Sequence, residues 1–329
     1  MIGAHQAEKR SRGWLITVSR WFAALIVLGI LIHFLPLRLV REALWRVPLT
    51  RFVAILLGYL LAHSVGIAKW RMVVNAAGAR LDYATSAQCY TGGLFATLFL
   101  PSIIGGDVVR LAVGLRRSPN PAAVLAGNVV DRFLDMSAQA GLVLLGLLLL
   151  PGSLPSALQC QVRKSLFVFT GLLLVFAVLL LLFYRPLMRG RSVRFRRRLA
   201  RLRHALRSGR RRPHVLFLGW VLGTAIQFTF LFLTALLAIS CGLSSSLVPL
   251  RVWCFAWPLA KLAALLPLTQ GGIGVREAAL VALLSPFGAP AHLVLASGLV
   301  WEGVVIVGGL IAGLTAFLLR RSESLPKVH

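Results

Sequence analysis

The sequence predicts an all-α polytopic membrane protein with about six full transmembrane helices and two re-entrant helical hairpins inserted from opposite faces. Hydrophobic residues make up 58% of the 329 positions and charged residues only 14%, and the mean hydropathy is +0.83. A water-soluble surface needs more charge than this. The net charge of +27 predicts anionic lipid as the partner and no nucleic acid, because the basic residues flank apolar runs instead of covering a polar domain.

Eight apolar segments approach the roughly 20 residues that a spanning helix needs. The first is long enough to span and lacks a small-residue cleavage site, so we expect a signal anchor that follows a short cytoplasmic N-terminus. The eight segments are residues 14–35, 49–68, 84–104, 122–150, 164–184, 215–240, 252–268 and 291–319, and the N-terminus is residues 1–13.

A basic connector over residues 185–214 determines the predicted orientation. Thirteen arginines and no acidic residue lie from Arg185 to Arg212, and short loops this basic stay on the cytoplasmic side, where anionic lipid also binds them. If all eight segments crossed the membrane, the connector would lie outside. Two segments must therefore turn back, which places both termini, including the tail 321–329, in the cytoplasm.

The connector itself has two possible structures. Phe195, Leu199, Leu202 and Leu206 recur at helical spacing between its arginines, which predicts a helix lying on the membrane surface. The alternative is an unstructured basic loop that only enforces the orientation.

Two glycine-containing breaks indicate which segments turn back. The first hairpin, residues 84–117, breaks at Pro101-Ser-Ile-Ile-Gly-Gly-Asp107. About ten residues follow before Arg116 and Arg117, and as a helix they cover roughly 15 Å, half of a hydrocarbon core. The second hairpin, residues 252–286, breaks at Pro267-Leu-Thr-Gln-Gly-Gly-Ile-Gly274. Interrupted segments in both halves point to a transport site near the bilayer midplane within one domain, residues 14–320.

Several acidic residues lie inside or next to apolar segments, where an ionised side chain without a partner is unfavourable. An ionised group near the bilayer centre costs about 2.5–3.5 kcal/mol and so faces a partner or a water-filled cavity. Three-residue spacing predicts that Asp107 pairs with Arg110 and Arg132 with Asp135. Five of the nine acidic residues lie inside or against apolar segments, namely Asp107, Asp131, Asp135, Glu277 and Glu302.

A polar stripe is predicted on one helix. Asn128, Asp131, Asp135 and Gln139 follow one another at helical spacing, and the second half of that segment, residues 141–150, is apolar. The simplest arrangement that solvates the stripe is a polar cavity open toward the cytoplasm. On the second hairpin, Glu277 is expected to contact Lys261 or a neighbouring helix instead of the lipid.

The glycines of the two breaks predict an anion site. Gly105-Gly106 and Gly271-Gly272-Ile-Gly274 would expose backbone amides where short helices begin, beside Arg110 and Arg276, and such helix ends suit phosphate. Two alternatives remain open. Asp107 could cap its helix, with the glycines supplying the turn, or the charges could be ion pairs that lock helices together without any ligand.

Three stretches together resemble the lysylphosphatidylglycerol synthase transmembrane domain family of flippase-like membrane domains. They are Leu100-Pro-Ser-Ile-Ile-Gly-Gly-Asp-Val-Val-Arg110, Asp131-Arg132-Phe-Leu-Asp135 and Pro267-Leu-Thr-Gln-Gly-Gly-Ile-Gly-Val-Arg-Glu277. Family members often have Glu where this chain has Asp131. The resemblance covers residues 14–320 and implies a lipid translocase fold, with re-entrant helices around a cavity for envelope lipids such as aminoacylated phospholipids or hopanoids. It also implies that the chain lies in the inner membrane of a bacterium.

Bifunctional members of that family carry a soluble aminoacyltransferase domain after the membrane part. No such domain follows residue 321, so we expect a lipid transporter that does not aminoacylate lipid. The alternatives are an intramembrane lipid-modifying enzyme that uses two carboxylates as acid and base, and an accessory protein that moves nothing. The sequence leaves the oligomeric state open, including a homo-oligomer.

The predicted head-group and ion-pair residues are drawn from the two breaks, the polar stripe and the last segment. No catalytic residue, metal or cofactor is expected, because the histidines and cysteines are scattered and the four cysteines suit apolar packing. The site residues are Gly105, Gly106, Asp107, Arg110, Asn128, Asp131, Arg132, Asp135, Gln270, Gly271, Gly272, Gly274, Arg276, Glu277 and Glu302, and the cysteines are Cys89, Cys160, Cys241 and Cys254.

Overall fold

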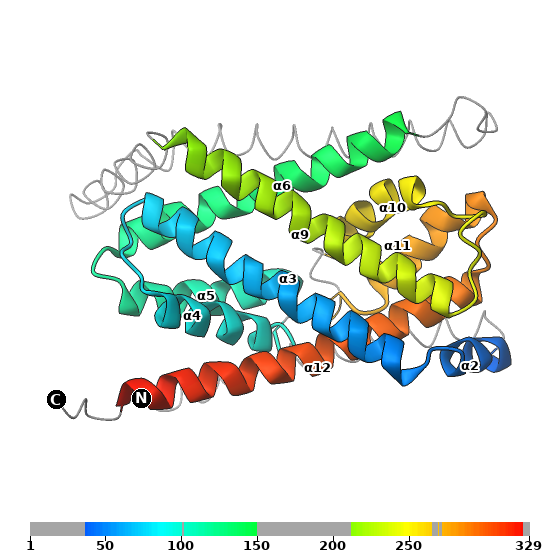
Figure 1. The fold of residues 1–329 in the computed structure, drawn as a ribbon, viewed down its shortest axis with the longest axis horizontal. Coiled ribbons are helices and arrows are strands. Elements are labelled where there is room, and N and C mark those ends of the chain that lie inside the picture. The colour runs from blue at the N-terminus through cyan, green and yellow to red at the C-terminus, as the bar shows by residue number, and fades with distance from the viewer. Residues whose placement is uncertain (1–36, 101, 150–211, 265–268, 270–271, 325–329) are drawn as a thin grey trace, which may run out of the picture.

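The computed structural model describes residues 37–100, 102–149, 212–264, 269 and 272–324, and within them every regular element is a helix (Figure 1). This agrees with the predicted all-α class. In chain order the helices are α2 (Leu37–Trp45), α3 (Leu49–Ala76), α4 (Tyr83–Ala96), α5 (Ser102–Arg117), α6 (Pro121–Leu148), α9 (Pro213–Ser240), α10 (Leu250–Ala263), α11 (Val275–Leu284), the 3₁₀ turn η1 (Ser285–Phe287) and α12 (Ala291–Ser324).

Four long helices form the body of the molecule. Helices α3, α6 and α9 each have 28 residues and α12 has 34, more than the roughly 20 that cross a membrane. Among the described helices, α3, α9 and α12 are long and apolar enough to span, whereas α6 carries Asp131, Arg132 and Asp135 near its middle. Helix α9 packs on both α3 and α6, and α12 packs on α3 and α9.

Two pairs of short helices lie toward opposite ends of the long axis (Figure 1). Helix α4 packs on α5, and α10 packs on α11. Their lengths of 14, 16, 14 and 10 residues correspond to about 15–24 Å, less than a hydrocarbon core. The pairs occupy the segments predicted to form the first and second hairpins.

Glycines allow α4 and α5 to approach closely. A Cβ at Gly93 would lie 2.7 Å from the Gly106 carbonyl oxygen, and a Cβ at Gly106 would lie 2.5 Å from the Gly93 oxygen. Helix α5 already begins at Ser102, so Gly105 and Gly106 lie inside it. The prediction that these glycines expose amides at a helix start is therefore wrong, and so is the alternative that Asp107 caps that helix. Both glycines are closely packed, Gly106 against Gly93 of α4 and Gly105 against Leu100.

Three boundaries differ from the predicted ones. Helix α3 continues to Ala76, eight residues beyond the predicted end, because Lys69 and Arg71 interrupt an apolar run that resumes after them. Helix α2 was not predicted, since nine residues with alternating polar and apolar character give no spanning signal. Helix α9 begins at Pro213, inside the predicted connector, and proline is favoured at this first position. Segments 14–35 and 164–184, the N-terminus 1–13, and residues 185–211 and 325–329 lie outside the described residues. Helix α12 includes residues 321–324 of the predicted tail.

Two hydrophobic clusters hold the helices together. The larger joins α9, α10, α11 and α12 through fully buried side chains such as Leu231, Trp253, Leu280 and Leu295. The smaller joins α3 and α6, around the completely buried Trp70. As predicted, the three described cysteines, Cys89, Cys241 and Cys254, are free and buried.

Candidate functional site

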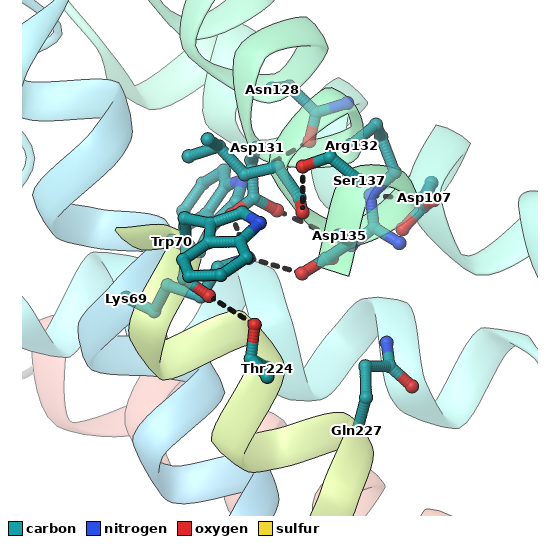
Figure 2. Close-up of polar contacts among 12 residues, drawn as sticks. Lys69, Trp70, Asp107, Asn128, Asp131, Arg132, Asp135, Ser137, Thr224 and Gln227 are labelled. Carbon is teal, nitrogen blue, oxygen red and sulfur yellow. Dashed lines mark hydrogen bonds and ion pairs between the residues drawn. The ribbon is translucent and has the colours of Figure 1, made fainter. Parts of the chain in front are cut away.

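Lys69 on α3 is the centre of an ion-pair network with two carboxylates of α6 (Figure 2). Its Nζ lies 2.7 Å from Asp131 Oδ1 and 2.5 Å from Asp135 Oδ1. The Lys69 and Asp131 side chains are almost completely buried, at 3% and 2% exposure. Figure 2 shows the three side chains directed toward one another between the two helices. The predicted polar stripe is therefore neutralised from a neighbouring helix.

Two arginines extend this network to α5. Arg110 Nη2 lies 2.7 Å from Asp107 Oδ1, three residues away as the spacing predicts. Arg132 Nη2 lies 3.4 Å from an oxygen of Asp131 and of Asp135, and its Nε lies 3.4 Å from Asp107 Oδ2. Three cations thus face three carboxylates, so the network carries no net charge.

Aromatic rings fix Arg110 further. Its guanidinium lies 5.5 Å from the centroid of the Trp70 ring and 5.2 Å from that of Tyr90, within cation–π range. Trp70 in turn donates its indole N–H to Asn128 Oδ1 at 3.1 Å. Because Arg110 is 3% exposed and held from three sides, it is a fixed part of the network.

Lys69 is absent from the residues that the sequence predicted. The predicted segment ended at residue 68, just before it. A signal was available, because Gly66, Lys69, Trp70 and Val73 share one helical face of α3 and all are buried. A lysine on the apolar face of a continuing helix is itself an indication of an intramembrane partner.

A second group of charges joins α11 to α12. Arg276 Nη2 donates to Glu277 Oε1 at 2.8 Å and to Glu302 Oε1. Glu277 Oε2 accepts the backbone N–H of Gly274 at 2.7 Å, which closes a cap at the start of α11. Gly274 has φ +82° and Gly272 φ +81°, which a side chain rarely adopts.

This arrangement bears on the predicted anion site of the second hairpin. The guanidinium of Arg276 and the amide of Gly274 already bind protein carboxylates, and Arg276 is buried. The geometry favours the ion-pair alternative at these two residues. Gln270 and Gly271 lie outside the described residues.

Of the two expected partners of Glu277, Lys261 is wrong and a neighbouring helix, α12, is confirmed. Lys261 Nζ donates to Gln227 Oε1 of α9 at 2.9 Å. Glu277 binds its neighbour Arg276, whose long side chain overcomes the 100° that separates adjacent positions on a helix. Glu277 also packs on α12, where a Cβ at Gly298 would lie 2.6 Å from its Cγ.

Two cavities adjoin these charges. The network cavity, about 520 Å³, is lined by the six residues of the network together with Asn128 and Gln139. The aromatic cavity, about 440 Å³, is lined by Arg276 and Glu302 together with five aromatic residues. Those five are Tyr59, Phe99, Phe230, Trp257 and Trp301. The side chains that line both cavities are His63, Leu94, Thr97, Phe230 and Lys261.

The aromatic cavity has a packed inner wall and an apolar edge. The Trp301 ring lies 5.3 Å from the Trp257 ring and 5.8 Å from the Tyr59 ring, measured between centroids. At the edge, Phe99 and Leu310 are 53% and 52% exposed. The connections of both short helix pairs contribute to this cavity, through Thr97, Leu98 and Phe99 on one side and Ile273 on the other.

Comparisons with known proteins complete the description of the site. Within the described residues, no group of three or more His, Cys, Asp or Glu side chains is arranged to hold a metal ion. A search of curated proteins finds no match for the chain. The model of one family, described as the lysylphosphatidylglycerol synthase TM region, matches residues 18–313, which include all the charged residues of both cavities. This membrane protein therefore belongs to the family of the lysylphosphatidylglycerol synthase transmembrane region.

Proposed function

We propose that this protein is a lipid transporter that moves a polar-headed envelope lipid, of the phospholipid, aminoacylated or hopanoid type, between the two leaflets. The observation that carries the proposal is the pair of adjoining cavities, which combine a charged interior with an exposed apolar edge. A lipid has the same two-part chemistry. Its head group needs polar contacts inside the protein, and its tails need to stay in hydrocarbon.

The charge balance of the network cavity supports this proposal. A polar path through a membrane protein must be hydrated enough to solvate a lipid head group. It must also avoid buried charges without a partner, because such charges are costly in free energy. Lys69, Arg110 and Arg132 are matched by three carboxylates, so the ion-pair network that lines this cavity is polar but has no net charge. Such a cavity can admit a head group and release it again.

The apolar edge of the aromatic cavity supports the second half of the proposal. Phe99, Ile306 and Leu310 line this cavity and are 53%, 44% and 52% exposed. Side chains of this kind match acyl chains. We propose that the tails remain at this edge while the head group occupies the interior.

The proposed topology is six full spans and two re-entrant hairpins in the inner membrane, with both termini and the basic connector in the cytoplasm. The support is that connections of the two short helix pairs line one cavity, as expected for hairpins that enter from opposite faces and meet near the midplane. Cysteine labelling tests it: residues 186–212 and both termini should react only from the cytoplasm, and residues 152–161 and 241–250 only from outside. External labelling of the connector would contradict the two-hairpin arrangement.

Reconstitution into liposomes with labelled lipid in one leaflet tests the function. Redistribution of chemically unaltered lipid, faster than in protein-free vesicles, is the expected result. An intramembrane enzyme would instead change the lipid, which mass spectrometry of the extracted lipids detects. An accessory protein would leave both the lipid and its distribution unchanged. The pairing of every described carboxylate in the cavities with a cation argues against a free acid–base pair for the enzyme alternative.

A further inference from the structure

Lys261 differs from every other lysine or arginine that lines the two cavities. It projects from α10 into the wall that the network cavity and the aromatic cavity share. Lys69, Arg110, Arg132 and Arg276 all pair with carboxylates. Within the described part of the chain, Lys261 makes no ion pair.

The contacts of the Lys261 ammonium are with uncharged groups. It donates to the amide oxygen of Gln227 at 2.9 Å, and it lies 5.4 Å from the centroid of the Phe230 ring. An ammonium has three N–H donors, and a glutamine oxygen accepts only part of this capacity and supplies no negative charge. Figure 2 shows Gln227 on α9 apart from the ion pairs of α3 and α6. Lys261 is thus held in position without being neutralised.

An unneutralised ammonium inside a membrane protein is unfavourable unless an anion reaches it. The carboxylates of the two flanking groups bind Lys69, Arg110, Arg132 or Arg276, and none of them makes an ion pair with Lys261. The α11–α12 group has two carboxylates for one arginine, so the charges around the two cavities balance overall, but no anion of the described chain lies in direct contact with Lys261. A ligand in the cavities can supply that contact. A phosphate diester carries one negative charge and several acceptor oxygens, and it is the anionic group of a phospholipid head.

We infer that Lys261, positioned by Gln227, binds the phosphate of the head group at the junction of the two cavities. This inference rests on the proposed transport function and assigns its substrate class as a phosphate-bearing lipid. It also reassigns the roles of the arginines, because Arg110, Arg132 and Arg276 hold the cavity walls while the lysine contacts the ligand. A head group passing from one cavity to the other would pass this ammonium.

Two measurements on the full chain test the inference. The first is transport in proteoliposomes of phosphatidylglycerol, phosphatidylethanolamine and a glycosyl diacylglycerol that lacks phosphate. The second is binding of phosphatidylglycerol to the protein in detergent micelles, with inorganic phosphate as a competitor. The variants are Lys261→Gln, Lys261→Arg and, as a matched control, Arg251→Gln, which removes a positive charge from an exposed position of the same helix.

We expect Lys261→Gln to weaken binding and transport of both phospholipids by about ten-fold, since a hydrogen bond to a charged group contributes affinity of that order. The glycosyl lipid has no phosphate for Lys261 to bind, so the wild type should transport it slowly and Lys261→Gln should transport it at the same slow rate. Lys261→Arg should retain most activity and Arg251→Gln all of it. Abundance and thermal midpoint should not change in Lys261→Gln, because no carboxylate loses its partner.

The results that overturn the inference are distinct from those that overturn the transport function. Unchanged phospholipid binding and transport in Lys261→Gln would remove Lys261 from the site while leaving the transporter intact. No transport of any lipid by the wild type would end the proposed function, and binding of phosphatidylglycerol that depends on Lys261 would still support the phosphate site. Inorganic phosphate that competes as strongly as the lipid would contradict a lipid site. If Lys261→Gln does not fold, Lys261→Arg alone tests the inference. Loss of phosphatidylglycerol binding in Lys261→Arg at normal abundance would contradict recognition of the phosphate by a positive charge at this position, and retained binding would support it.

Discussion

The ammonium of Lys69 on α3 lies 2.7 Å from the carboxylate of Asp131 on α6, and both side chains are almost completely buried. Sixty-two positions separate them in the chain. The pair therefore connects two long helices across the interior, and its members cannot be solvated if the pair is broken. The stability of the whole network should depend on this contact.

Replacing Lys69 with methionine should destabilise the protein strongly. Methionine fills the volume, but Asp131 and Asp135 lose their nearest cation, and breaking a buried pair costs about 3–5 kcal/mol. The double variant Lys69→Met/Asp131→Asn should recover much of the loss, because two arginines then face two carboxylates. The measurement is the thermal midpoint and the monodisperse yield in detergent.

The control for that series is Arg41→Met, which removes a charge from an exposed position on α2. It should leave the midpoint unchanged. If Lys69→Met/Asp131→Asn is no more stable than Lys69→Met, then the unpaired carboxylate charge is not the cause of the lost stability.

Replacing Gly93 with alanine should separate α4 from α5. The new Cβ would lie 2.7 Å from the backbone oxygen of Gly106, an atom that cannot rotate away, and overpacking of this kind costs about 1–3 kcal/mol. The neighbouring Gly92→Ala meets nothing closer than Ala316 Cβ at 4.0 Å and should be neutral or slightly stabilising. Thermal midpoints of the two variants test this, and equal midpoints would contradict the close contact.

Replacing Gly298 with alanine should disturb Arg276 without touching it. The added Cβ would lie 2.6 Å from Cγ of Glu277, and displacing Glu277 removes acceptors from both Arg276 and the Gly274 amide. On the same helix, Gly303→Ala meets only Phe52 at 3.6 Å and serves as the control.

We expect Gly298→Ala to lower the thermal midpoint and Gly303→Ala to preserve it. A further variant, Glu277→Gln, should behave like Gly298→Ala if the pairing with Arg276 is what stabilises α11. Full stability of Glu277→Gln would mean that packing alone holds this helix in place.

Much of the fold follows from local sequence signals. Four long helices and two broken segments are visible as apolar runs, and Pro121 and Pro213 stand at the first positions of α6 and α9, where a missing N–H costs nothing. Pairs within one helix, such as Asp107 with Arg110, follow from three-residue spacing. Signals between residues this close in the sequence can be interpreted without knowledge of the tertiary structure.

The parts that the sequence did not predict depend on distant residues. Lys69 meets Asp131 across 62 positions, and Arg276 meets Glu302 across 26, so no spacing rule relates them. The start of α5 at Ser102 was missed because Gly105 and Gly106 are poor helix formers. Close packing on Gly93 outweighs that propensity, and only the position of α4 shows it.

The start of α4 provides a pH-dependent test outside the membrane-spanning helices. Asp82 is the N-cap of α4, and its Oδ2 accepts the backbone N–H of Thr85 at 3.3 Å. Hydrogen bonding from Thr85 lowers the pKa of the exposed Asp82 carboxyl below its usual value, and this effect outweighs the opposing desolvation. The folded state therefore favours the ionised carboxylate.

The sign of the pH effect follows from that lowered pKa. The stabilisation from Asp82 is fully present above the unfolded pKa of about 3.9 and is lost as the pH falls through the lower folded value. Asp82→Ala should cost about 1 kcal/mol at neutral pH, as for other N-caps. Asp82→Asn keeps a side-chain acceptor that does not titrate, so its midpoint relative to the wild type should rise as the pH falls from about 6 to below about 4. Thermal midpoints of the three proteins across this range provide the measurement. A constant difference between the wild type and Asp82→Asn would show that the Asp82 carboxylate does not gain stability from its charge at the start of α4.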